Sequence, residues 1–288
     1  VTMIGYIREI DGLRALAVLA VILFHLDPAI LPGGFSGVDV FFVISGYVVT
    51  KSVIDHQNRH QLPFHRYLTA FYARRMVRIF PALIVMLLVT SLATVLFVPE
   101  SWLSQSLNKV GLWAFAGLSN FALVWHTDGY FSPRTEFNPY THTWSLGVEE
   151  QFYVIAPLLL FVWLAAFRRD SRWQNAALAL MPLLAIASLW YSALQTSQQP
   201  MQAFYLLPAR FWELAAGAWL YQLQHSGWLR HGHANGLRIS MWLGTILVAC
   251  GFAVSDKSQF PWPWALLAES GTSMMLLDIT ASNSPRSL

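Results

Sequence analysis

The feature that most constrains this chain is a series of nine apolar runs, each close to the length that crosses a lipid bilayer. An α-helix needs about twenty mostly apolar residues to span the hydrocarbon core, whereas a transmembrane β-barrel would show alternating strands of about ten residues. Charged residues make up only 11% of the chain, against about 25% in a soluble domain. We therefore expect an all-α, polytopic transmembrane helical bundle. The runs cover residues 10–26, 35–54, 77–98, 107–124, 147–167, 176–194, 206–223, 239–254 and 264–279.

Lysine and arginine predict the orientation of this bundle, because cytoplasmic connections of membrane proteins are enriched in both. The most basic connection, 51–78, holds one lysine and five arginines, so we place it and the N-terminus in the cytoplasm. A second basic cluster at 168–172 is placed there on the same ground. Both clusters can face the cytoplasm only if the run at 107–124 is re-entrant, and Gly111 and Gly117 are compatible with such a break. This predicts eight crossings plus one re-entrant segment.

The run at 10–26 carries two polar side chains, Arg14 and His25, which are eleven residues apart. At ~100° and ~1.5 Å per residue they lie within roughly 20° of one helix face and about 16 Å apart along it. A cation and an imidazole at such positions are costly unless they have a function. Two simpler interpretations remain open: Arg14 pairs with Asp11, and His25 is an interfacial histidine.

Asp39 lies just inside the second run, close to the end of the first, in the stretch GGFSGVDVFFVISGY. A carboxylate beside His25 would fix its tautomer and raise its basicity, as a general base requires. Alternatively, Asp39 is favoured by the dipole of a helix N-terminus. In RRMVRIFP, Arg75 and Arg78 are one turn apart and could grip phosphates, although a basic flank can also simply mark topology.

The stretch NPYTHTWSLGVEEQFY supplies His142, Ser145, Glu149 and Glu150 at the start of the fifth run. Two carboxylates entering an apolar segment cost a few kcal/mol each, so we expect one at the helix start and the other facing the bundle. A Ser–His–acid hydrolase is disfavoured because the chain has no GxSxG nucleophile elbow.

Further along, Arg210 is followed three residues later by Glu213, a spacing that predicts a mutual ion pair as readily as a functional site. The chain has no Cys–His cluster and no HExxH motif, so we expect no metal. Its net charge of +3 is too small to indicate nucleic acid as a partner.

Taken in order, these motifs resemble the acyltransferase 3 family of bacterial integral membrane acyltransferases. The resemblance covers most of residues 5–270 and includes FYLLPARFWELAAGAWL around Arg210. It implies a multi-pass protein of the bacterial inner membrane. Such an enzyme transfers an acetyl group from cytoplasmic acetyl-CoA to a hydroxyl of a surface glycan, such as lipopolysaccharide O-antigen.

The resemblance also implies residue roles at the two ends of the first helix. Phosphates of CoA would be held by three arginines, Arg14, Arg75 and Arg78. His25 would act as a base or transient acyl carrier. Three further residues would orient or polarise the groups at the outer end of this helix, around His25: Asp39, His142 and Glu150.

One membrane domain is expected over residues 1–280, followed by a tail at 281–288. The family usually has more helices than the runs found here, so we expect its last helices to be missing. Two alternatives therefore stay open: an inactive, truncated acyltransferase fragment, and a transporter or flippase that uses the same buried charges.

Overall fold

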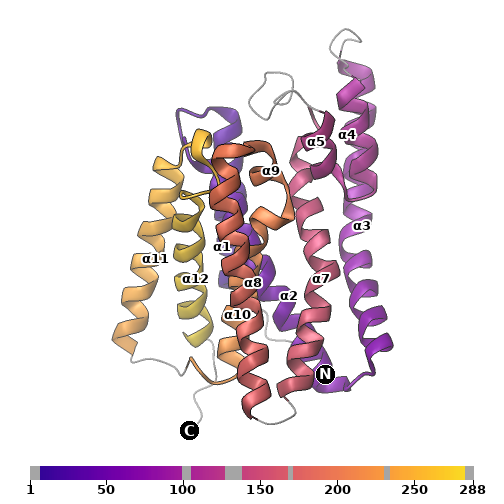
Figure 1. The fold of residues 1–288 in the computed structure, drawn as a ribbon. Helices are drawn as coiled ribbons and strands as arrows, with labels where there is room; N and C mark the ends of the chain where they lie inside the picture. The colour runs from indigo at the N-terminus through magenta and orange to yellow at the C-terminus, as the bar shows by residue number, and fades with distance from the viewer. Residues whose placement is uncertain (1–6, 99–104, 127–137, 168–170, 230–233, 283–288) are drawn as a thin grey trace.

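A computed structural model describes residues 7–98, 105–126, 138–167, 171–229 and 234–282. These residues form α-helices joined by turns and short 3-10 segments, which confirms the expected all-α class (Figure 1). The α-helices are α1 (Arg8–Leu26), α2 (Gly37–His60), α3 (Phe64–Phe97), α4 (Gln105–Phe115), α5 (Ser119–His126), α7 (Trp144–Phe167), α8 (Ser171–Gln198), α9 (Pro200–Tyr205), α10 (Leu207–His225), α11 (Ala234–Val254) and α12 (Ala265–Ser282). The short 3-10 helices are η1 (Gly34–Ser36), η3 (Thr141–Thr143) and η4 (Lys257–Gln259).

Four helical segments are long and apolar enough to cross a membrane. They cover Gly34–His60, Phe64–Phe97, Thr141–Ala166 and Trp173–Gln198, and Ile239–Val254 is a shorter apolar helix. The chain is therefore a multi-pass helical protein, while the count of eight crossings stays a prediction. Part of the second basic cluster, 168–170, and most of the expected tail, 283–288, lie outside the described residues.

The run at 107–124 is broken at Gly117, whereas Gly111 lies inside α4. α4 ends at Phe115, α5 begins at Ser119, and Gly117 between them has a φ of +68°, a conformation that side chains rarely adopt. The carboxylate of Glu150 packs so closely against Gly117 that a Cβ there would overlap it. α4, α5 and the short α9 gather toward one end of the bundle (Figure 1).

Local chemistry explains several of the helix boundaries. α2 ends where Gln61 adopts the left-handed conformation, with a φ of 46°, and Pro63 directly precedes α3. Pro208 lies in the first turn of α10, where its missing N–H leaves no intrahelical hydrogen bond unmade. These residues place the beginnings of α3 and α10 and the end of α2.

α2 is the central helix of the bundle, buried along most of its length and packed closely on α10. At their contact, Gly46 faces the backbone of Leu214 and Gly217 faces the backbone of Val43, and a Cβ at either glycine would overlap a carbonyl oxygen. Small residues of this kind let membrane helices approach closely. α3, by contrast, has a long exposed apolar face that suits contact with lipid.

Candidate active site

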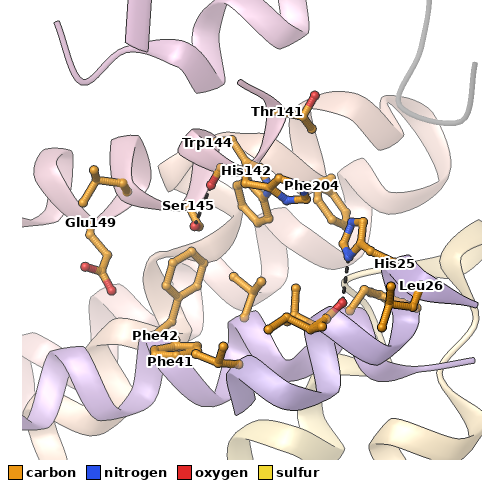
Figure 2. A pocket seen from close by; sticks show the side chains of 16 residues that line it. His25, Leu26, Phe41, Phe42, Thr141, His142, Trp144, Ser145, Glu149 and Phe204 are labelled. Atoms are coloured by element: carbon orange, nitrogen blue, oxygen red, sulfur yellow. Dashed lines mark hydrogen bonds between the residues drawn. The ribbon is translucent and has the colours of Figure 1, made fainter. Parts of the chain in front are cut away.

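Two histidine rings meet at the end of α1. The ring centroids of His25 and His142 are 4.7 Å apart and their planes are inclined by 76° (Figure 2). Nδ1 of His25 lies 2.8 Å from the carbonyl oxygen of Val21. Because a carbonyl oxygen can only accept, Nδ1 carries the proton in the neutral ring and Nε2 keeps a free lone pair. Both histidines are exposed, so this nitrogen is accessible.

These histidines line a cavity of about 570 Å³, which we call the histidine cavity. Its walls come from α1, α2, η3, α7 and α9 and are mostly apolar. Figure 2 shows Phe42, Trp144 and Phe204 in this lining, with Glu149 at the far end of the cavity from His25. The cavity therefore combines one accessible basic nitrogen with room for an uncharged group.

A second, smaller cavity of about 280 Å³ contains the arginines that the sequence singled out, and we call it the arginine cavity. Arg14 of α1 and Arg75 and Arg78 of α3 all line it. The pairing of Arg14 with Asp11, foreseen as an alternative, is present at 3.3 Å. Three guanidinium groups around one cavity form a site suited to phosphate oxygens.

The two cavities share two lining residues, Phe41 and Glu149. Oε1 of Glu149 accepts a hydrogen bond of 2.6 Å from Ser45, and its Oε2 accepts one of 2.9 Å from Tyr153. The sequence predicted Glu150, the neighbour of Glu149, as the site residue. Adjacent residues of a helix point about 100° apart, so only the packing of α7 decides which carboxylate faces the cavities.

Glu150 lines neither cavity in the structure. Its side chain instead packs against Gly117 at the break between α4 and α5, and within the described chain its Oε1 is buried without a hydrogen-bond partner. The structure therefore places Glu150 beside the broken segment and away from His25 and His142.

The expected contact between Asp39 and His25 is also replaced by another arrangement. Oδ1 of Asp39 accepts a hydrogen bond of 2.7 Å from Arg210, which also donates one of 2.8 Å to Glu213. All three side chains are fully buried. The carboxylate is thus held by a cation from α10, and the carbonyl of Val21 orients the imidazole instead. The predicted Arg210–Glu213 ion pair is present, but the second ion pair, between Arg210 and Asp39, was not predicted.

Arg210 links this ion-pair cluster to the histidine cavity. Its guanidinium lies 5.2–5.7 Å from the centroids of four aromatic rings. These rings belong to Phe42, Trp144, Phe204 and Phe260, and the first three also line the cavity. Cation–π contacts and ion pairs together hold the buried charge. The cluster therefore supports the cavity wall from behind.

The site lacks the geometry of a serine hydrolase over the part of the chain that is described. The Ser145 hydroxyl donates to the backbone oxygen of His142 at 3.4 Å, and no hydrogen bond to an imidazole ring is present. Nor do the described residues bring together three His, Cys, Asp or Glu side chains that could hold a metal ion.

Comparison with known proteins identifies the class of protein to which this site belongs. A family model described as an acyltransferase domain matches residues 7–288. The chain therefore belongs to the acyltransferase 3 family, as its motifs predicted.

Three relatives show how similar the chain is to individual proteins. The chain is 35% identical over 213 residues to the peptidoglycan O-acetyltransferase OatA of Listeria monocytogenes, a match that covers 74% of this chain and 33% of that protein. It is 31% identical over 279 residues to YrhL of Bacillus subtilis, covering 94% of this chain and 43% of YrhL. The O-acetyltransferase OatA of Staphylococcus aureus is 37% identical over 163 residues, covering 57% of this chain and 26% of that protein. The chain thus spans less than half the length of these relatives, and no solved structure matches it.

Proposed function

We propose that this chain is a membrane O-acyltransferase that takes an acetyl group from acetyl-CoA and passes it to a hydroxyl of a glycan. One observation carries the proposal: a cavity lined by three arginines and a cavity lined by two histidines share a wall at Phe41 and Glu149. A donor with phosphates at one end and a reactive thioester at the other matches this pair of cavities.

The arginines are assigned to the phosphates of CoA. Guanidinium groups bind phosphate oxygens through paired, charge-assisted hydrogen bonds, and Arg75 and Arg78 project from adjacent turns of α3. Arg14 approaches the same cavity from α1. The acetyl end of the donor would then lie in the histidine cavity.

His25 is assigned the chemical step. Nε2 takes the proton of the acceptor hydroxyl while the hydroxyl oxygen attacks the thioester carbonyl carbon. The carbon–sulfur bond breaks, and the imidazolium returns its proton to the departing sulfur. The products are an acetylated sugar and free CoA. Nε2 could instead carry the acetyl group transiently, which uses the same free lone pair. His142, in ring contact with His25, would orient the acceptor or the imidazole.

The roles expected for Asp39 and Glu150 change with their positions. Asp39 would act through Arg210 on the wall of the histidine cavity, and Glu149 would take the place at the cavity that was expected of Glu150. The basic connection supports an orientation with the arginine cavity toward the cytoplasm of a bacterium and the N-terminus inside, in the inner membrane.

The names of the relatives suggest which glycan to test first as the acceptor. The name of the Listeria relative includes peptidoglycan, which makes a peptidoglycan hydroxyl the first acceptor to test. A hydroxyl of lipopolysaccharide O-antigen, expected from the sequence, is the second. The accessible Nε2 of His25 suits either sugar, since both present a simple alcohol.

The direct test is mass spectrometry of cell-wall and surface glycans from cells with and without the chain. We expect an added acetyl mass that disappears with His25→Ala, because the free ring nitrogen is lost, while the variant still inserts into the membrane. Unchanged acetylation in a well-expressed His25→Ala variant would remove His25 from the mechanism.

A further inference from the structure

Glu149 is one of two residues that the arginine cavity and the histidine cavity have in common. The other is Phe41. Within the histidine cavity, Glu149 lies at the end away from His25 (Figure 2). A flexible ligand anchored among the arginines and reacting at His25 therefore runs past this carboxylate.

The carboxylate of Glu149 has acceptor capacity left over. Ser45 donates to Oε1 at 2.6 Å and Tyr153 donates to Oε2 at 2.9 Å. Each carboxylate oxygen can accept about two hydrogen bonds, so each retains one lone pair. Over the described ranges, the only side-chain hydrogen bonds to Glu149 come from these two hydroxyls. The remaining lone pairs lie on the residue that both cavities share.

The surroundings of Glu149 select the kind of group that it can bind. A carboxylate repels a phosphate, whereas Arg14 and Arg75 of the arginine cavity attract both the phosphate and the carboxylate, and the wall at Phe41 is apolar. The best partner is an uncharged group with an N–H donor on an otherwise apolar chain. A hydrogen bond from such a donor to a charged acceptor is among the stronger ones in proteins.

This inference rests on the proposed function, in which the ligand is CoA. The arm of CoA between its phosphates and its sulfur contains two amide linkages, each with one N–H. We propose that Glu149 accepts a hydrogen bond from an amide N–H of this arm and so sets how far the thioester reaches toward His25. Glu149 is then a substrate-binding residue outside the chemical step.

The test is a binding experiment on the purified full chain in detergent. It uses free CoA and two CoA analogues in which one or the other amide is replaced by an ester, which removes the N–H and keeps the shape. Titration calorimetry gives the ratio of dissociation constants, analogue over CoA. Variants are Glu149→Leu, Glu149→Gln and, as a matched control, Glu269→Gln, since Glu269 is a carboxyl on α12 that lines neither cavity.

We expect a ratio of about ten for at least one analogue in the wild type and in Glu269→Gln, and a ratio near one in Glu149→Leu. If Glu149→Leu does not fold, the ratio in Glu149→Gln must fall below the wild-type value, because a neutral amide oxygen is a weaker acceptor. A ratio that is the same in wild type and Glu149 variants overturns the inference and leaves CoA as the donor. Failure of the wild type to bind CoA at all overturns the donor assignment together with the inference.

Discussion

At the scale of single residues, the site depends on which nitrogen of His25 is free. The hydrogen bond from Nδ1 to the carbonyl oxygen of Val21 leaves Nε2 unprotonated in the neutral ring, beside His142 and in the mouth of an apolar cavity. No carboxylate is needed for this tautomer. The backbone of α1 itself orients the imidazole, and the fully buried Asp39 is free to hold Arg210 instead.

Arg75→Lys tests whether the arginine cavity binds phosphate through paired hydrogen bonds. Lysine keeps the positive charge but loses the planar pair of donors, so we expect CoA binding to weaken about tenfold, the effect of losing one charge-assisted hydrogen bond. Titration of the purified chain with CoA measures this change. Arg66→Lys is the control, because Arg66 is an exposed arginine of α3 that lines neither cavity. Unchanged binding in Arg75→Lys would show that charge alone matters, and equal weakening in both variants would show that the effect is not specific to the arginine cavity.

Residue chemistry could be predicted well where it depends on short spacing. Arg75 and Arg78 are one turn apart, and both line the arginine cavity, as their spacing indicated; Arg14 and His25 lie on one helix and line the arginine and the histidine cavity, respectively. The predicted contact of Asp39 with His25 was wrong, because the actual partner of Asp39, Arg210, is 171 residues away in the chain. Glu150 was chosen over Glu149 because the direction in which α7 faces depends on packing across the bundle.

At the scale of helices, the buried ion pairs tie α2 to α10. Arg210→Met should destabilise the protein by roughly 3–5 kcal/mol, because it leaves the carboxylates of Asp39 and Glu213 buried without their cation. A lowered midpoint of thermal unfolding in detergent, read by fluorescence-detected gel filtration, would show it. Adding Asp39→Asn to Arg210→Met should recover part of the loss. No change in the midpoint for Arg210→Met would mean that the ion pairs do not hold these helices.

The close contact of α2 and α10 makes a second prediction at this scale. Gly217→Val should lower the unfolding midpoint, since a side chain there overlaps the carbonyl oxygen of Val43, and overpacking costs about 1–3 kcal/mol or more. Gly12→Ala is the control: a Cβ at Gly12 meets nothing within 4 Å, and alanine favours a helix by roughly 0.5–1 kcal/mol. Equal midpoints for Gly217→Val and the wild type would contradict the helix contact.

The helices could be predicted from the apolar runs, and Gly117, one of two glycines compatible with a break, lies at the break between α4 and α5. The pairing of helices could not be predicted, because no local pattern says that α10 rather than another apolar helix covers α2. The small residues at Gly46 and Gly217 are a signal for close packing, but only the folded chain shows that they face each other's helices.

At the scale of the whole molecule, an active enzyme differs from two alternatives, an inactive fragment and a transporter, in properties that can be measured. The chain spans 33% of the Listeria relative and 43% of the Bacillus one. An inactive fragment would neither bind CoA nor stay monodisperse in detergent. A transporter would use the buried charges and the two neighbouring cavities as a solute path and move its cargo without acetyl-CoA. We expect a monodisperse protein that binds CoA and transfers acetyl.

The most direct measurement places donor and acceptor on opposite sides of a membrane. Proteoliposomes of oriented protein would receive acetyl-CoA with a radiolabelled acetyl group on the side of Arg14 and peptidoglycan fragments on the side of His25. We predict label covalently attached to the fragments, CoA remaining on its own side, and loss of transfer in His25→Ala. Label that crosses as intact acetyl-CoA, or transfer that survives in His25→Ala, would contradict an acyl transfer between the arginine cavity and the histidine cavity.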